Sequence, residues 1–228
     1  MVLEIHLRLK SDATFGRGDG VAGLIDAEVE HDEYGMPYLR GRTLKGLLVE
    51  ECANLLYAIN KKQPAVAGKL GQAAKQLFGQ AGSSLKDDGL MQVGAAMLPA
   101  DLREALKNDV NDEKWRPEEI LESLTAIRRQ TAISEKTSAP EKNSLRSMRV
   151  ILRETLFISR LNIAPSPQAN QDDLKGLLAA CLLSLHRAGT GRNRGRGRLN
   201  ATLHDKEGKD ITDECFAHFK EGFPTEKG

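Results

Sequence analysis

The sequence has few cysteines and no long hydrophobic run. Its three cysteines, Cys52, Cys181 and Cys215, show neither the spacing of a disulfide framework nor a CxxC pair, which argues against a structural zinc site. No apolar run approaches the roughly 20 residues that cross a bilayer, and the first ten residues alternate in polarity, unlike a signal peptide. We therefore expect a cytoplasmic protein with no membrane partner.

An excess of one charge is also lacking, but the charges are unevenly distributed. The 228 residues include 33 Lys and Arg against 32 Asp and Glu. Acidic residues gather in 26–33 and beyond 205, and basic residues gather in 40–45, 142–160 and 192–198. Local basic stripes favour nucleic-acid binding even in a neutral chain, although a charged run is also typical of a solvated face.

Hydrophobic periodicity predicts an α+β protein. Apolar and charged residues alternate over 2–10, as in a half-buried strand, whereas apolar residues recur at helical intervals from 43 onward. The same reasoning adds strands at 89–98 and 149–163, a helix at 174–185 and a last strand after 198. The order strand, helix, strand, repeated once, is the ferredoxin-like arrangement of RNA-recognition-motif proteins.

We expect this modified ferredoxin-like core to form one domain over 1–204, followed by a C-terminal tail at 205–228. Helical insertions are predicted near 55–120. A polar, basic excursion at 125–148 is long for an idle loop, and such excursions are more often functional. Only 4% of the residues are aromatic, too few to expect the base-stacking platform of an RNA-recognition motif.

The strongest local motif is the glycine-arginine loop, GTGRNRGRGR at 189–198. Closely spaced glycines expose backbone N–H groups to phosphate oxygens, and arginine forks bind the same oxygens in pairs. The loop lacks the GK[ST] ending of a nucleotide-binding P-loop, and its place after a helix is wrong for a dinucleotide site. A solvated turn is the alternative to a phosphate clamp built from Gly191, Arg192, Arg194, Gly195, Arg196 and Gly197.

A second basic motif, PYLRGRTLKG at 37–46, surrounds the predicted start of a helix. Unpaired N–H groups at a helix start attract phosphate, and Thr43 is a candidate cap. A capped helix with a basic first turn is equally compatible with a role in solubility. The candidate RNA contacts are Arg40, Arg42, Thr43 and Lys45, together with Gly16, Arg17 and Gly18 from the glycine-rich segment after the first strand.

These motifs resemble those of a known family. The segment FGRGDGVAGLIDAEVEHDEYGMPYLRGRTLKGLL resembles the amino-terminal region of the RAMP superfamily, which builds CRISPR effector complexes, and GTGRNRGRGRL resembles its carboxy-terminal glycine-rich loop. LFGQ at 77–80 and the run from 128 to 157 resemble landmarks of the repeated backbone subunit of type III complexes. The resemblance spans residues 1 to about 204. One departure is QVGAAML, where the family leads us to expect an acidic residue near Gly94.

The resemblance implies a role in antiviral ribonucleoproteins. A backbone subunit of this family binds guide RNA (crRNA) together with similar subunits, and its thumb-like hairpin intrudes into the duplex of guide and target RNA. The excursion at 125–148 would be the thumb. Its candidate RNA contacts are Arg128 and Arg129, with Lys136, Lys142 and Arg146 as further basic residues and Ile127, Ile133 and Leu145 as apolar wedges.

The resemblance also implies a catalytic carboxylate at Asp26, which would hold a divalent cation, Mg²⁺, and make the chain an endoribonuclease acting on target RNA. Asp32 and Asp19 are the competitors, and an ordinary acidic loop is the alternative reading. The chain would then be a non-catalytic RNA-binding scaffold. A guide-processing endoribonuclease comes last, because the five histidines are dispersed without suitable spacing.

Overall fold

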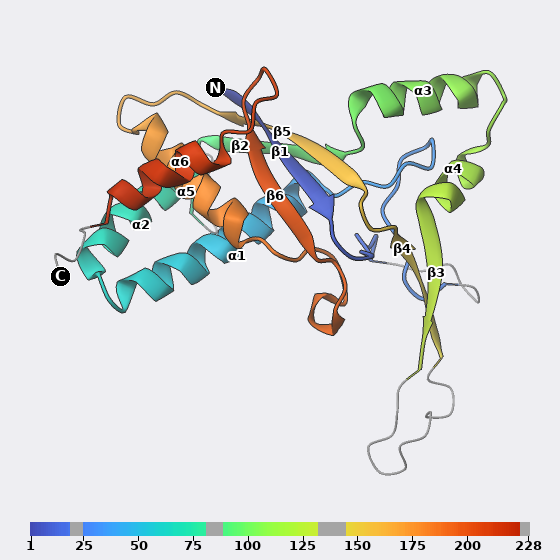
Figure 1. The fold of residues 1–228 in the computed structure, drawn as a ribbon, viewed down its shortest axis with the longest axis horizontal. Coiled ribbons are helices and arrows are strands. Elements are labelled where there is room, and N and C mark those ends of the chain that lie inside the picture. The colour runs from blue at the N-terminus through green and yellow to red at the C-terminus, as the bar shows by residue number, and fades with distance from the viewer. Residues whose placement is uncertain (19–24, 81–88, 132–144, 224–228) are drawn as a thin grey trace, which may run out of the picture.

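A computed structural model describes residues 1–18, 25–80, 89–131 and 145–223 of the chain (Figure 1). Its core is a four-stranded antiparallel sheet with the order β2-β5-β1-β6. This order is that of a ferredoxin-like fold, so the predicted α+β class and core are confirmed. The strands are β1 (Val2–Leu9), β2 (Met91–Met97), β5 (Leu156–Ile163) and β6 (Leu199–His204).

One face of this sheet forms the hydrophobic core. The alternation in β1 places Leu3, Ile5, Leu7 and Leu9 on that face, each at most 3% exposed. Helices α1 (Gly41–Asn60) and α5 (Gln171–Ser184) contribute their apolar sides to the same core. All three cysteines are free thiols buried within the fold, as expected of small core residues.

The predicted continuous strand at 149–163 is wrong. The chain instead forms β4 (Arg146–Ile151), which pairs with β3 (Thr125–Gln130) in a separate two-stranded sheet, and then β5 of the main sheet. Between them Glu154 has a positive φ of 67°, and its N–H donates to the Leu9 carbonyl at 2.9 Å. The sequence conceals the turn, because the charged Arg153 and Glu154 follow apolar residues as they would in a half-buried strand.

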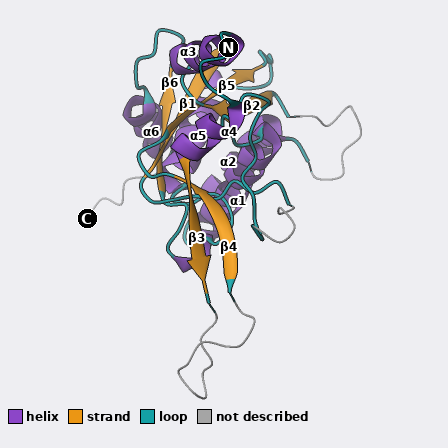
Figure 2. Cartoon of the chain, turned by 90° about the vertical axis from the view of Figure 1, so that its right-hand side faces the viewer, coloured by secondary structure: helices purple, strands orange, loops and turns teal. Residues whose placement is uncertain are grey.

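The β3–β4 hairpin projects from the body of the molecule, at the position of the predicted thumb (Figure 2). Residues 132–144, with Ile133, Lys136 and Lys142, lie outside the described residues. The predicted helical insertions contain α2 (Pro64–Phe78), α3 (Ala100–Asn111) and α4 (Pro117–Leu124).

Two local predictions need correction. Thr43 does not cap α1, because the helix begins two residues earlier and no side chain caps it. The segment at 205–228 contains α6 (Thr212–Glu221), which packs against α5 and buries Cys215. No helix in the described ranges is long and apolar enough to cross a membrane.

Candidate nucleic-acid interface

The glycine-arginine loop is anchored at both ends, so its arginines are displayed by a defined backbone. The Thr190 N–H donates to the Thr14 carbonyl, and the Gly197 N–H donates to the Asp12 carbonyl, both at 2.9 Å. A Cβ atom at Gly197 would overlap the Ala188 carbonyl oxygen, and φ is +68° there. Only glycine satisfies both conditions without strain.

Between these anchors, Arg192–Arg194 form a single 3₁₀ turn. It is flanked by Gly191 and Gly195, whose φ values of 72° and 80° favour glycine. The Arg187 guanidinium donates to the Arg192 carbonyl at 2.7 Å and ties the turn to the segment that follows α5. The loop is therefore a short structured turn.

A groove of about 550 Å³ brings together three segments that sequence analysis singled out. Gly16 comes from the glycine-rich segment after β1, Arg40 and Thr43 come from the start of α1, and Arg192 comes from the glycine-arginine loop. These segments are far apart in the sequence and converge only in the fold. The other lining residues are Phe15, Glu30, Tyr38, Leu39, Gly46, Leu47, Glu50, Gly189 and Thr190.

Acidic partners hold two of the groove's arginines. Arg40 donates to Oε1 of Glu30 at 2.9 Å and forms an ion pair with Oε2 at 2.8 Å, and the Tyr38 hydroxyl donates to Oε1 at 2.7 Å. Burial raises the pKa of Glu30, but the hydrogen bonds from Arg40 and Tyr38 outweigh it and leave the pKa below its usual value. Arg192 forms a two-pronged pair with Glu50, with both distances 3.1 Å.

The start of α1 presents free backbone donors to this groove. Its first helical hydrogen bond is made by the Leu44 N–H, no side chain caps the helix, and the first turn has no acidic residue. Uncapped N–H groups and the helix dipole both favour an anion. Gly41 lies so close to the β2 backbone at Val93 and Gly94 that a side chain would clash, which fixes the helix start against the sheet.

Several predicted RNA contacts near the start of α1 and in the glycine-rich segment after β1 do not line this groove. Lys45 donates to the Met91 carbonyl at 3.2 Å, so its charge is tied to β2. Arg42 is exposed but is not among the lining residues, and neither are Arg17 and Gly18, which are exposed nearby.

A second groove, of about 580 Å³, continues from the first and shares Gly189, Thr190 and Arg192 with it. It runs along the glycine-arginine loop to the β3–β4 hairpin, where Met148 and Gln130 line it. The remaining lining residues are Ala27, Gln130, Met148, Gly191, Arg194 and Arg196. Arg196 contacts the Met148 sulfur, whereas Arg194 is exposed and has no ion pair within the described ranges. Gly195 and Gly197 shape the loop without lining either groove.

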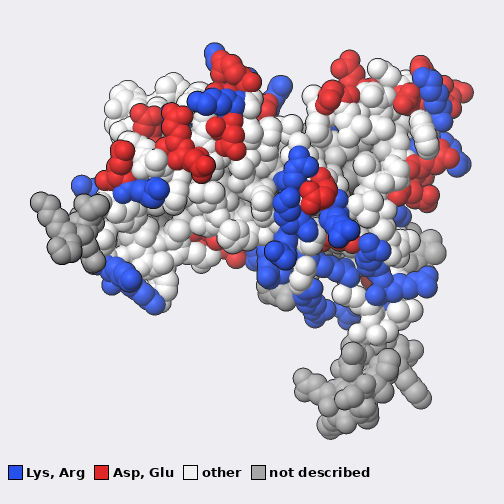
Figure 3. All heavy atoms as spheres, viewed as in Figure 1, with Lys and Arg blue, Asp and Glu red and all other residues white. Residues whose placement is uncertain are grey.

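The β3–β4 hairpin carries further positive charge (Figure 3). Arg128 donates twice to one oxygen of Asp12, at 3.0 and 2.9 Å, so this predicted RNA contact is bound to the body of the protein. Arg129 alternates to the opposite side of the strand and is exposed, as are Arg146 and the apolar Ile127 and Leu145.

Asp26 lies beside the same hairpin. Its N–H donates to the Ser147 carbonyl at 2.8 Å, and its carboxylate accepts the Ser147 N–H at 2.7 Å, while the side chain is exposed. The neighbouring carboxylates have other partners. Glu28 pairs with Arg149 at 2.9 Å, and Asp32 accepts the backbone N–H groups of Tyr34 and Met36 in its own turn. Asp19 lies outside the described residues.

Within the described residues no three His, Cys, Asp or Glu side chains are grouped to hold a metal ion. Asp26 therefore offers a bound ion a single carboxylate, without neighbouring protein ligands among the described residues. This arrangement fits Mg²⁺, which keeps several waters and is commonly bound by one or two carboxylates plus substrate phosphates. It does not fit a cage built entirely from protein ligands.

Sequence analysis missed five polar or soft residues of the grooves: Glu30, Tyr38, Glu50, Gln130 and Met148. Helical periodicity alone indicates that Thr43, Leu47 and Glu50 share one side of α1. No local signal marks Gln130 or Met148, because their place depends on the pairing of β3 with β4.

Known proteins share this architecture. One solved structure, "Cryo-EM structure of the Type III-B Cmr-beta bound to cognate target RNA", contains a similar chain with a TM-score of 0.60 and 12% identity, covering 94% of this chain and 98% of the other. A second, "Type III-B Cmr-beta Cryo-EM structure of the Apo state", gives a TM-score of 0.61 and 13% identity, with coverages of 90% and 98%. At such identities the likeness shows the fold.

No curated protein matches the sequence. The family model of the RAMP superfamily matches residues 6–200, which is most of the chain and includes both grooves. The chain therefore belongs to the RAMP superfamily.

Proposed function

We propose that the chain is a backbone subunit of a type III CRISPR ribonucleoprotein, where it holds guide RNA in the two continuous grooves. The observation that carries the proposal is the convergence of Gly16, the start of α1 and the glycine-arginine loop on one groove. Free N–H groups and arginine forks are the donors that an RNA backbone requires. Membership of the RAMP superfamily and the fold of the Cmr-beta chains support the same role.

The grooves suit a backbone and not a base sequence. Their lining supplies one ring from Phe15 and one from Tyr38; the Phe15 ring is buried, and the half-buried Tyr38 is tied to Glu30 through its hydroxyl. Sequence-specific recognition is then left to base pairing between guide and target, as in other RNA-guided systems.

We further propose that Asp26 takes part in cutting the paired target RNA. Its exposed carboxylate lies beside Ser147 of the β3–β4 hairpin, next to the second groove that Ala27 lines. When bound, a divalent cation would supply Lewis-acid stabilisation of the reacting phosphate. Asp26 would hold that cation or orient the ribose 2′-hydroxyl, while Ser147 keeps the carboxylate in place.

Asp26→Asn separates this enzyme from a scaffold subunit. The amide oxygen can still accept the Ser147 N–H, so the loop should keep its fold while the charge is lost. In a complex reconstituted with guide and partner subunits, target RNA should bind normally, and Mg²⁺-dependent cleavage should fall by about a hundredfold or more.

Asp32→Asn is the matched control, because that side chain caps its own turn. If Asp26→Asn cuts at the normal rate, the catalytic part of the proposal is wrong, and the chain is a scaffold for RNA.

A further inference from the structure

The first groove contains a carboxylate that would repel a bound polyanion. Glu50 lines the groove from α1 with its side chain 49% exposed, and it pairs with Arg192. An exposed pair exchanges partners at little cost, so a phosphate that binds Arg192 leaves Glu50 beside a strand of the same charge. This contact lowers affinity unless the strand offers the carboxylate a hydrogen-bond donor. The sugar–phosphate backbone of RNA has one such donor, the ribose 2′-hydroxyl.

The other carboxylate of this groove cannot serve the same donor. Glu30 is only 8% exposed, and it already accepts hydrogen bonds from Arg40 and the Tyr38 hydroxyl. Glu50 instead lies on the exposed side of α1 that also carries Thr43. Among the described lining residues, Glu50 is therefore the charged acceptor that is open to a 2′-hydroxyl in the groove.

Gly46, one helical turn before Glu50, leaves space on the same wall of the groove. It is exposed, lies inside α1 and lines the first groove. Apart from its own helical turn, a Cβ atom there would meet no heavy atom of the described residues within 4 Å, so packing does not require glycine. Gly41 differs, because a side chain there would clash with β2. Glycine weakens a helix interior relative to alanine, so an unforced glycine at this position points to a ligand that needs the space.

We propose that Gly46 and Glu50 form a ribose subsite through which the first groove distinguishes RNA from DNA. One sugar of the bound strand lies against the α1 backbone at Gly46, beside the half-buried Leu47, and its 2′-hydroxyl donates to the Glu50 carboxylate. A phosphate of the same strand binds Arg192, so the strand replaces one internal ion pair by two contacts of its own. The inference rests on the proposed function and names the part of the RNA that this groove selects.

Binding of two labelled single strands of the same sequence, RNA and 2′-fluoro RNA, tests the subsite by fluorescence anisotropy. The 2′-fluoro strand keeps the phosphates and the sugar pucker of RNA but lacks the 2′ donor. The full chain should bind RNA about tenfold more tightly, the scale of a hydrogen bond to a charged group. Since both strands carry the same charge, the phosphate contacts cancel in this ratio.

Two neutral variants separate the acceptor at Glu50 from its charge. Both release Arg192, but Glu50→Gln keeps an acceptor oxygen and Glu50→Ala has none. We expect Glu50→Gln to retain a reduced preference for RNA over 2′-fluoro RNA, and Glu50→Ala to bind the two strands equally. A tenfold preference that survives in Glu50→Ala overturns the proposal.

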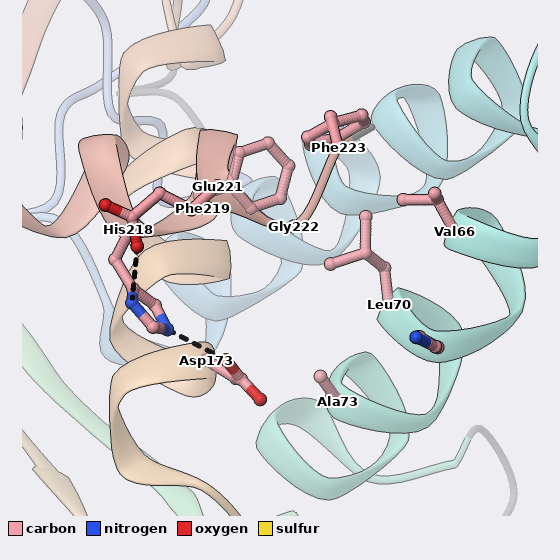
Figure 4. Close-up of a pocket in the computed structure, with 10 residues that line it drawn as sticks. Val66, Leu70, Ala73, Asp173, His218, Phe219, Glu221, Gly222 and Phe223 are labelled. Carbon is pink, nitrogen blue, oxygen red and sulfur yellow. Dashed lines mark hydrogen bonds and ion pairs between the residues drawn. The ribbon is translucent and has the colours of Figure 1, made fainter. Parts of the chain in front are cut away.

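Gly46→Ala tests the space beside the carboxylate, and Gly68→Ala is its matched control. In Gly46→Ala the melting temperature should rise by about 2–4 °C, because alanine favours the helix, while RNA affinity should fall at least about threefold. Gly68 is likewise exposed and unforced in α2, which faces α6 across a hollow lined by Val66, Leu70 and Phe219 (Figure 4). Among the described residues, that hollow shares no lining residue with either groove, so Gly68→Ala should melt higher and bind RNA normally.

The outcomes distinguish failure of the subsite from failure of the RNA-binding role. Equal affinities of the unmodified chain for RNA and 2′-fluoro RNA, or normal RNA binding by Gly46→Ala, overturn the subsite and leave RNA-backbone binding in the groove intact. If the unmodified chain binds neither strand, the proposed function is wrong and the subsite with it.

Discussion

Removing three of the four loop arginines, Arg192, Arg194 and Arg196, tests the grooves most directly. Arg192 and Arg196 line the grooves at half-buried positions, and Arg194 is exposed there. In the triple variant to Ala, each lost phosphate contact on a single strand should remove about 0.7 from the slope of log affinity against log salt, so the slope should flatten by about 2. The fold should survive, since the exposed Arg192–Glu50 pair contributes at most about 1 kcal/mol.

Glu50→Gln should change RNA affinity in the opposite direction, which makes the test more specific. In the free protein Glu50 occupies the Arg192 guanidinium and places a negative charge in the groove. Neutralising it releases the arginine, and an exposed pair of about 0.2–1 kcal/mol corresponds to a gain in RNA affinity of up to about fivefold.

Fluorescence anisotropy of a labelled single-stranded RNA, titrated at several salt concentrations, measures both affinity and slope. Glu51→Gln is the matched control, since that neighbouring carboxylate does not line the groove. An unchanged slope in the triple variant, or weaker binding by Glu50→Gln, refutes the reasoning.

Three further predictions concern stability and the hairpin. Gly197→Ala should cost more than about 1 kcal/mol in thermal melts and more than Gly195→Ala, because both have positive φ but only the former meets the Ala188 carbonyl. Desolvation lowers the pKa of His6 in the folded protein, so protonation of this side chain favours the unfolded chain. The melting temperature should therefore fall as the pH drops below about 6.5, and it should fall less in His6→Gln. Replacing 131–145 by a two-residue turn should preserve the β3–β4 ladder and guide binding but alter the spacing of target cuts on a sequencing gel; loss of folding would contradict this.

The hydrophobic pattern was sufficient to predict most of the fold. Period-2 alternation located β1, and helical spacing located α1 and α5, because each buries one face against the same core. The break between β4 and β5 escaped prediction. It depends on the positive φ of Glu154 and on the contact of this residue with Leu9 at the end of β1. Neither feature can be predicted from the polarity of neighbouring residues.

The candidate site was predictable to a similar degree. Glycine and arginine spacing identified the loop and the helix start, since those residue types have few other uses together. The spacing did not reveal which basic side chains are bound by other groups of the protein. Arg128 is bound by Asp12, which is 116 residues away, and Lys45 is bound by a strand carbonyl, so both charges depend on tertiary pairing.

The acidic partners in the first groove have different roles because they differ in burial. Glu30 is 8% exposed, its pKa is lowered by the Arg40 and Tyr38 hydrogen bonds, and breaking this cluster would leave a charge without a partner inside the protein. Arg40 is therefore fixed in place, with part of its guanidinium turned to the groove. The Arg192–Glu50 pair is open to water, where exchange of one anion for another costs little. Incoming phosphate should thus displace Glu50 and leave Glu30 in place, so Arg192 is the arginine whose partner changes on binding.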